Sequence, residues 1–356
     1  MSRFISPRYT DLVPYIPGEQ PKDPDIIKLN ANETSMPPSP RVLAVLKSER
    51  MRHLGRYTDP SSMELKTALS RRYAVRTSEV LVGNGSDEIL GLIFLTFFEQ
   101  ARIAYPDVTY GFYRTMARSF GIDHAEIPLR ADFTVDVDAY VHSDRHIVLA
   151  NPNAPTGYVL PVSEIERIVA ANPQRLVVID EAYVDYGNES CVPLIHKYDN
   201  LLVVQTMSKS RNLAGAHIGY CFGAASLIKD LEGMKAAFNP FNLSDVSMAI
   251  GTASVEDEAY FEHCVKETIA AREYTKEALR QLGFYVMDSH TNFVFVTHPW
   301  LTAEAYNAQL RAHGIIARHY PDDPRVSNFL RITIGTREEM EAVIAATKEI
   351  LCQLAA

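Results

Sequence analysis

The short polar motif Thr206–Lys209 offers a group that could do chemistry, because its lysine directly follows the apolar run Leu201–Gln205. A lysine amine at the end of a buried strand loses solvation, which lowers its pKa and suits it to Schiff-base formation. The flanking hydroxyls of Thr206 and Ser208 could hold a phosphate. Taken alone, this motif is explained more simply by a surface lysine in a loop between a strand and a helix.

Two carboxylates, Asp180 and Glu181, end a second apolar run, Leu176–Ile179. A carboxylate that is buried without a partner costs several kcal/mol, so one at this position needs a partner. That partner could be a cationic ring nitrogen, a metal ion or a neighbouring arginine, and the local pattern leaves all three open.

Two further motifs also follow apolar runs. Gly83–Glu88 comes after Val80–Val82 and opens a helix, and the free amides of a helix N-terminus favour a phosphate. The alternative is an ordinary helix start that Ser86 or Asp87 caps. Asn151–Gly157 contains two prolines, two asparagines and a glycine, which predict a rigid turn that can aim an amide at a ligand, or a turn alone.

The elements that must position these motifs are short apolar strands that alternate with amphipathic helices. Continuous apolar runs predict strands covered on both faces, and therefore an α/β fold with a mainly parallel central sheet flanked by helices. Ligands bind at the carboxyl ends of the strands in such sheets, so the motifs are expected to meet there. The expected strands are Val80–Val82, Ala101–Tyr105, His124–Ile127, His146–Ala150, Leu176–Ile179, Leu201–Gln205 and Gly219–Phe222.

The length of 356 residues suggests about two domains. We expect a proline-rich N-terminal arm, residues 1–45, that packs with a small domain, then a large cofactor-binding domain at 46–255. Residues 256–356 are expected to form the small α+β domain. Its expected helices are Ala259–Leu282, Ala303–His313 and Arg337–Leu354, and its expected strands are Phe284–Asp288, Asn292–Val296, Ile315–Arg318 and Phe329–Ile334.

Composition excludes several classes of protein. Lys plus Arg total 35 and Asp plus Glu total 44, and the net charge of −9 argues against a nucleic-acid partner. The longest apolar run, Ile89–Phe98, is shorter than the roughly 20 residues that cross a membrane. Four scattered cysteines and the lack of an apolar N-terminal signal favour a cytoplasmic protein. His142 and His146 lead into a strand, so no metal site is expected.

The motifs carry more information together than singly. A phosphate loop, a strand-end aspartate and a strand-end lysine on one sheet are the groups that bind pyridoxal phosphate, because the lysine forms the Schiff base and the aspartate pairs with the ring nitrogen.

The order and the residues of these motifs resemble those of the fold-type I pyridoxal-phosphate aminotransferases, and most closely those of the histidinol-phosphate aminotransferase family. The resemblance spans roughly Leu29 to Arg337. It implies a homodimer that transfers an amino group between L-histidinol phosphate and 2-oxoglutarate, giving imidazole-acetol phosphate and L-glutamate in histidine biosynthesis. Further motifs that carry it are Leu29–Glu33, Arg56-Tyr57, Thr109–Gly111, Asp180–Tyr183 and Leu330–Thr336.

The resemblance implies a role for each matching residue. Lys209 would hold the cofactor and move the proton during catalysis, Asp180 would pair with the ring nitrogen, Tyr183 would hydrogen-bond the ring oxygen, and Tyr110 would stack on the ring. Tyr57 would reach the cofactor phosphate of the other subunit. The remaining implied contacts are Gly85, Ser86, Asp87, Thr206 and Ser208 for the cofactor, and Asn32, Arg318 and Arg331 for the substrate, with the two arginines facing the substrate phosphate.

Two positions depart from the family pattern. Ala154 stands where an asparagine usually contacts the ring oxygen, and Asn153 is the expected substitute. His217 stands where an arginine usually binds the cofactor phosphate, which implies weaker cofactor retention, and Arg211 is a candidate for the missing charge.

Three rival functions remain open at this stage. A phosphothreonine decarboxylase and an aminotransferase for aromatic or other amino acids would use the same scaffold. A non-catalytic protein that binds pyridoxal phosphate or a nucleotide phosphate through Gly83–Ser86 would belong to another class.

Overall fold

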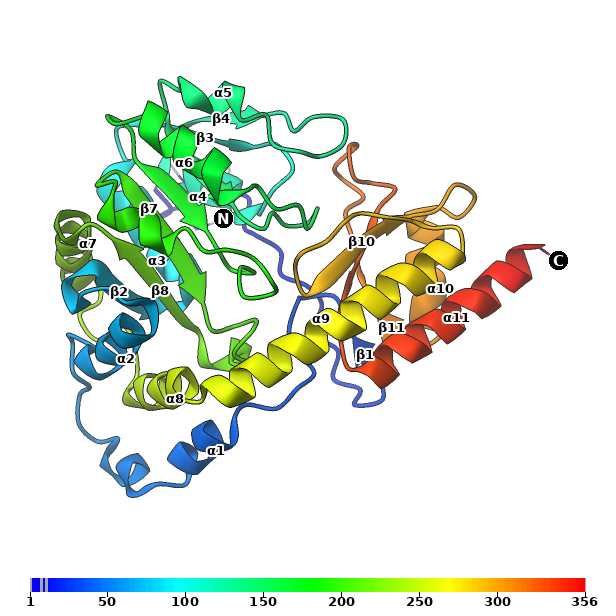
Figure 1. Cartoon of the computed structure of the whole chain (residues 1–356), viewed down its shortest axis with the longest axis horizontal. Coiled ribbons are helices and arrows are strands. Elements are labelled where there is room, and N and C mark those ends of the chain that lie inside the picture. The colour runs from blue at the N-terminus through cyan, green and yellow to red at the C-terminus, as the bar shows by residue number, and fades with distance from the viewer. Residues whose placement is uncertain (1, 7–8, 10–11, 356) are drawn as a thin grey trace.

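A seven-stranded sheet forms the centre of the larger part of the molecule in this computed structural model, which describes residues 2–6, 9 and 12–355 (Figure 1). The strand order is β2-β8-β7-β6-β5-β3-β4. Neighbouring strands are parallel except that β8 runs antiparallel to both β2 and β7, so the prediction of a mainly parallel α/β sheet is confirmed. The strands are β2 Val80–Asn84, β3 Arg102–Pro106, β4 Asp123–Ile127, β5 His146–Ala150, β6 Val177–Asp180, β7 Leu201–Thr206 and β8 Ile218–Gly223.

Helices cover both faces of this sheet, which explains the continuous apolar runs. In β7, Leu201 and Val203 belong to the core on one face, whereas Leu202 and Val204 belong to the core on the other. Helices α3 Gly85–Phe97, α4 Phe112–Phe120 and α7 Ala225–Phe238 supply residues to the second core. The helices that supply residues to the first core include α2 Met63–Tyr73, α5 Asp138–Val141, α6 Val162–Ala171 and α8 Asp245–Glu256.

The smaller part of the molecule contains a four-stranded antiparallel sheet with the order β12-β13-β10-β9. Helix α9 (Glu258–Gln281) starts beside α8 and runs into this part, where it packs near α11 (Figure 1). A separate apolar core joins these helices to the sheet. The other elements here are β9 Tyr285–Val286, β10 Phe293–Thr297, α10 Ala303–Ala312, β12 Arg318–His319, β13 Leu330–Thr333 and α11 Arg337–Ala355.

The N-terminal arm contacts both parts of the chain. Residues 12–23 form neither helix nor strand, and β1 (Ile27–Lys28) then pairs in parallel with β11 (Ile315–Ile316). The expected arm ends differently, because Pro40–Leu46 form helix α1, which Ser39 caps. Val42 of α1 lies in the core of the larger part. The middle of the expected arm therefore pairs with β11 of the smaller part, and its end packs in the core of the larger part.

Short 3-10 helices connect several elements, at Glu49–His53, Thr77–Glu79, Val192–His196 and Ala214–Ala216. Within the described residues, no helix is both long and apolar enough to span a membrane. Nor do three or more His, Cys, Asp or Glu side chains gather there as a metal site would require.

Candidate active site

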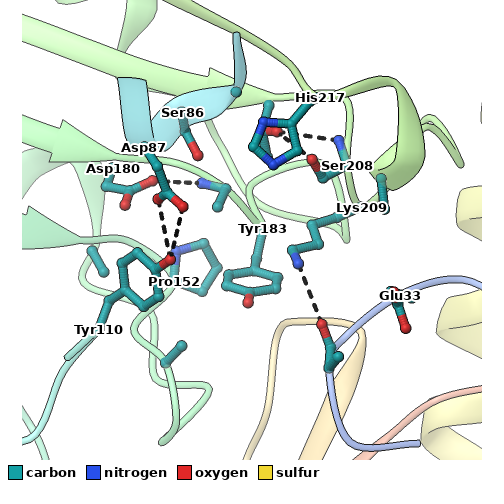
Figure 2. Close-up of a pocket in the computed structure, with 17 residues that line it drawn as sticks. Glu33, Ser86, Asp87, Tyr110, Pro152, Asp180, Tyr183, Ser208, Lys209 and His217 are labelled. Atoms are coloured by element: carbon teal, nitrogen blue, oxygen red, sulfur yellow. Dashed lines mark hydrogen bonds between the residues drawn. The ribbon is translucent and has the colours of Figure 1, made fainter. Parts of the chain in front are cut away.

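Residues from all four motifs line one cavity of about 220 Å³ at the carboxyl ends of β2, β5, β6 and β7 (Figure 2). Ten of the residues singled out from the sequence take part: Gly85, Ser86, Asp87, Tyr110, Asp180, Tyr183, Thr206, Ser208, Lys209 and His217. A second cavity of about 390 Å³ adjoins the first, because Tyr110, Tyr183 and Lys209 line both. Asn32, Arg318 and Arg331 line the second cavity.

Lys209 lies just beyond β7, and its side chain points into the first cavity (Figure 2). The Nζ atom lies 3.5 Å from the carbonyl oxygen of Ala31 and 5.9 Å from the centre of the Tyr183 ring. Burial, with a smaller contribution from the positive charge of Arg331, lowers the pKa of the lysine to about 8. A substantial fraction of the amine is therefore neutral near physiological pH, as a nucleophile must be.

Asp180 is the last residue of β6, and it is 4% exposed. Its Oδ2 accepts a hydrogen bond from the Tyr113 hydroxyl at 2.7 Å, and its Oδ1 accepts one from the backbone N–H of Ala182 at 3.2 Å. Burial nevertheless raises its pKa to about 6. A cationic ring nitrogen beside the carboxylate would lower this pKa. The protein neighbours of this buried anion stabilise it only in part, so the site suits a cationic partner.

The start of helix α3 forms one wall of the first cavity. Gly85 has a φ of 81°, and neither Ser86 nor Asp87 caps the helix, since the N-cap is Asn84 and its side chain makes no capping hydrogen bond. The backbone of β8 approaches closely, because a Cβ atom on Gly219 would lie 2.4 Å from the Ser86 nitrogen. Only glycine fits there, so backbone amides rather than side chains shape this wall.

Two hydroxyls and one imidazole complete the same end of the cavity. The Thr206 hydroxyl donates to Ser208 Oγ at 2.9 Å, which leaves the Ser208 proton available for a ligand oxygen. His217 Nδ1 lies 3.2 Å from the Asn84 carbonyl oxygen. When Nδ1 donates to that carbonyl, Nε2 is left for a ligand. This donor set suits a phosphate.

The aromatic residues of the cavity are fixed by polar contacts. The Tyr110 hydroxyl donates to Asp87 at 3.1 Å, and burial raises the pKa of that carboxylate. Asn32 Nδ2 donates to the Tyr183 hydroxyl oxygen at 2.8 Å. The Tyr183 proton is therefore left for another acceptor, as hydrogen-bonding to a ring oxygen would require.

The two predicted substrate arginines line the second cavity. Arg331 Nη2 donates to the Asn30 carbonyl oxygen at 2.9 Å, but its buried Nε has no partner. Arg318 Nη2 lies 3.4 Å from the Ile16 carbonyl oxygen. A guanidinium with unused donors beside a cavity suits an anionic substrate group.

The sequence did not predict that the N-terminal arm closes this second cavity. Four residues of the arm line it, namely Tyr15, Pro17, Gly18 and Gln20. The Tyr15 ring packs edge-on against Tyr110, with the ring centres 6.0 Å apart. Proline richness signalled an extended segment but gave no indication of where it would pack.

The Asn153 side chain does not take the position expected of a donor to the ring oxygen. Its Nδ2 donates to the Val108 carbonyl at 3.0 Å and to Thr156 Oγ1 at 2.9 Å, so both amide protons are used within the turn. Ala154 lines the first cavity, whereas Asn153 does not. This side chain therefore has no donor left for the ring oxygen.

Arg211 and Tyr57 also lie outside both cavities. Arg211 Nη1 donates to the Ser254 carbonyl at 2.7 Å, and its guanidinium stacks 4.0 Å from the centre of the Phe261 ring. It cannot supply the charge that we considered for the phosphate. Tyr57 is 85% exposed and stacks on Phe241 at 4.5 Å. The sequence placed Tyr57 in the other subunit's site, and a single chain leaves it at the surface.

Residues 24–346, about nine tenths of the chain, match the family described as aminotransferase class I and II. The chain belongs to the class I and II aminotransferases. A histidinol-phosphate aminotransferase from Marinomonas sp. strain MWYL1 is 46% identical over 353 residues, which cover 98% of this chain and 100% of that one. Among solved structures, a histidinol-phosphate aminotransferase from Sinorhizobium meliloti in complex with pyridoxal-5'-phosphate is 25% identical, with a TM-score of 0.83. That match covers 92% of this aminotransferase and 91% of the other chain.

An L-threonine-O-3-phosphate decarboxylase from Porphyromonas gingivalis shares the fold, with a TM-score of 0.81 and 21% identity over 92% of this chain and 99% of that one. The fold-type I prediction is confirmed by these similarities. The same architecture carries different reactions, so the reaction must be argued from the site.

Proposed function

We propose that this aminotransferase uses pyridoxal phosphate to transfer the amino group of L-histidinol phosphate to 2-oxoglutarate, as a cytoplasmic homodimer in histidine biosynthesis. The observation that carries the proposal is the shared wall of the two cavities. Lys209 lies in that wall, with a phosphate-binding end on one side and two arginines on the other. An amino substrate that reaches the arginines would present its reacting carbon to the lysine.

The side chains and backbone amides that line the first cavity suit the cofactor. The start of α3, Ser208 and His217 would hold the phosphate, and the carboxylate of Asp180 would pair with the ring nitrogen. When bound, pyridoxal phosphate delocalises the electron pair that is released when a bond to the substrate Cα breaks. Asp180 would support this by holding the ring nitrogen in its protonated form, and a pKa near 6 keeps the carboxylate mostly anionic at pH 7.

Lys209 would serve twice, first as the covalent anchor and then as the base. Its amine would take the proton from the substrate Cα and return it to the cofactor carbon C4′. A lowered pKa near 8 suits a group that must accept and donate a proton near neutral pH. Tyr183 would donate its free proton to the ring oxygen, and Tyr110 would cover one face of the ring.

Arg331 and Arg318 would bind the anionic ends of both substrates. The phosphate of histidinol phosphate and the carboxylates of 2-oxoglutarate both suit a guanidinium. Tyr15 and Tyr320 also line this cavity, and their rings would exclude water from the bound substrate.

A homodimer would complete the site. Tyr57 and Phe241 form an exposed aromatic stack, and Phe238 nearby in the chain is 70% exposed. Large exposed apolar groups of this kind are typical of protein interfaces. A second copy seated there would cover them and bring its Tyr57 to the cofactor phosphate.

Two experiments test the proposal. Borohydride reduction of the yellow protein, followed by peptide mass analysis, should find the cofactor on Lys209, and its absence there would end the pyridoxal-phosphate assignment. A panel of amino donors with 2-oxoglutarate should then give the highest kcat/KM for histidinol phosphate. Phenylalanine reacting equally well, or phosphothreonine losing carbon dioxide, would instead support the rival enzymes on this scaffold.

A further inference from the structure

Arg272 is a buried cation in the middle of α9, outside both cavities, and it is 5% exposed. Its Nη1 donates to the carbonyl oxygens of Thr291, at 2.9 Å, and Tyr186, at 3.3 Å. Its Nε donates to Glu273, whose side chain is 50% exposed. Burying a guanidinium is costly, and here two backbone carbonyls offset much of that cost.

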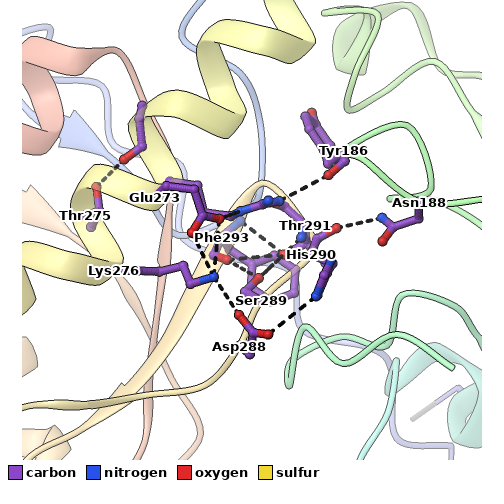
Figure 3. A network of polar contacts seen from close by, with 12 residues as sticks. Tyr186, Asn188, Glu273, Thr275, Lys276, Asp288, Ser289, His290, Thr291 and Phe293 are labelled. Carbon is purple, nitrogen blue, oxygen red and sulfur yellow. Dashed lines mark hydrogen bonds and ion pairs between the residues drawn. The ribbon is translucent and has the colours of Figure 1, made fainter. Parts of the chain in front are cut away.

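The two carbonyls belong to segments that are far apart in the chain. Tyr186 lies in the turn that follows Asp180, and Thr291 lies in the loop between β9 and β10 (Figure 3). The same loop makes two more hydrogen bonds to the larger part of the molecule. The His290 N–H donates to the Gly157 carbonyl at 3.0 Å, and Asn188 Nδ2 donates to the His290 carbonyl at 2.9 Å. This loop therefore joins the small sheet to the segments that line the first cavity.

Two routes made of hydrogen bonds and covalent links connect Arg272 to Tyr183. The first reaches its backbone, since the N–H of Tyr186, whose carbonyl Arg272 holds, donates to the Tyr183 carbonyl at 3.3 Å. The second reaches its hydroxyl. Asn292, next to Thr291, donates from Nδ2 to the Asn32 carbonyl at 2.9 Å, and Asn32 in turn donates to the Tyr183 hydroxyl.

The Tyr183 ring is held from the same loop. Phe293, the first residue of β10, packs edge-on against it, with the ring centres 5.3 Å apart and the planes at 89°. The backbone, ring and hydroxyl of Tyr183 are thus all connected to residues 291–293, and Arg272 joins this loop to the turn that carries Tyr183.

We infer that Arg272 is a positioning residue that sets the Tyr183 hydroxyl against the cofactor ring oxygen. The planar guanidinium suits this role because it donates to two acceptors in a fixed relative geometry. A hydrogen bond weakens steeply as its angle worsens, so a small rotation of Tyr183 would weaken its bond to the ring oxygen. The inference rests on the proposed function, in which Tyr183 binds that oxygen.

The test is the pH titration of the visible absorption band of the Lys209-bound cofactor in the holoenzyme. The Tyr183 proton stabilises the anionic ring oxygen and therefore lowers the midpoint of this titration. In Arg272→Gln the midpoint should rise by about 0.5 to 1 pH unit. In Arg272→Lys it should rise by less, because an ammonium keeps the charge but not the fork.

Lys276 supplies a matched control. It lies one turn further along α9, is 4% exposed, and binds Asp288 at 2.7 Å at the start of the same loop (Figure 3). Its contacts touch neither Tyr186 nor Thr291. Lys276→Gln and Arg272→Gln should both lower the Tm, but Lys276→Gln should leave the midpoint unchanged.

The possible outcomes separate the inference from the proposed function. An unchanged midpoint in the Arg272 variants, or an equal rise in Lys276→Gln, would overturn the positioning role. If Arg272→Gln does not fold, Arg272→Lys alone decides the question by the same measurement. A wild-type protein with no visible band and no borohydride adduct on Lys209 would instead overturn the proposed function.

Discussion

Asn32 donates a hydrogen bond of 2.8 Å to the Tyr183 hydroxyl from a backbone with a φ of 54°. Asparagine tolerates this left-handed conformation better than most residues. The side chain and the backbone of Asn32 are therefore both suited to holding Tyr183, and replacing Asn32 should affect catalysis and stability together.

We expect Asn32→Ala to lower kcat about tenfold and the free energy of unfolding by roughly 1–3 kcal/mol, because the variant loses a hydrogen bond and gains backbone strain. Steady-state assays and urea unfolding measure the two effects. Asn172→Ala is the control, since Asn172 is also buried and donates to the carbonyls of Tyr140 and Ile168, outside both cavities. It should lose stability and keep its kcat; a matching loss of kcat would show that the effect of Asn32 is not local.

Lys209 should destabilise the cofactor-free protein at neutral pH. Its pKa is about 8 when folded and 10.5 in its ordinary state, so the unfolded chain binds more protons between those values. The free energy of unfolding should therefore rise with pH from about 8 to 10.5. Below pH 8 the full cost of burying the charged lysine is present. We expect Lys209→Met to raise the free energy of unfolding at pH 7 by on the order of 2–3 kcal/mol.

The gain from Lys209→Met should fade as the pH approaches 10.5, and urea unfolding of the apoprotein at pH 7 and pH 10 measures it. Lys235→Met is the matched control, because Lys235 is 2% exposed but pairs with Glu232 at 2.6 Å. That variant should lose stability at pH 7. A Lys209→Met apoprotein no more stable than wild type at pH 7 contradicts the argument.

His217 should retain the cofactor less tightly than an arginine at this position. Its Nδ1 lies 3.2 Å from the Asn84 carbonyl oxygen, so one ring nitrogen is left for the phosphate, whereas a guanidinium offers a charged fork. We expect the dissociation constant of pyridoxal phosphate to be about tenfold lower in His217→Arg than in the wild type. Fluorescence titration of the apoprotein measures this constant.

Pyridoxal without its phosphate is the control ligand for His217. Its affinity should be the same in the wild type and in His217→Arg, because the variant changes only the phosphate end of the cavity. An equal change for both ligands would place the effect of His217 elsewhere.

Tyr57 should act in the site of the second subunit. Mixed dimers of Lys209→Ala and Tyr57→Phe chains contain one site with both native residues if Tyr57 acts across the interface. We expect such mixtures to bind the cofactor with native affinity at one site per hybrid dimer, although neither parent does. No native-affinity site in the mixture would place Tyr57 in its own chain's site. Tyr285→Phe, at a tyrosine that is 57% exposed, should behave as the wild type.

Much of the site could be predicted from the sequence because it depends on strand ends. Asp180 ends β6, and Lys209 lies just beyond the end of β7. These two strands are adjacent, parallel and buried throughout, and such strands align their carboxyl ends. A pattern of apolar runs is enough to predict that relationship. The same reasoning predicted that the start of α3 lies at the cavity.

The remainder depends on contacts that no local pattern encodes. Asn153 points away from the cavity because Val108 and Thr156 accept its protons, and a turn sequence does not specify which way its amides face. The expected strand Ile315–Arg318 is split, because its first residues pair with β1 and its last with β13. The position of Tyr15 in the cavity wall could not be predicted, because it depends on where the arm packs.

The bond between the Asn32 N–H and Thr333 Oγ1 spans 301 residues of chain. Asn32 and the arm before it are made early in translation, but their acceptors lie in β13 and β11, close to the C-terminus. All strands of the sheet that carries Lys209 are synthesised before β11 and β13. The substrate cavity cannot close until β11 and β13 have been made, so the site is assembled only after the large sheet has been synthesised.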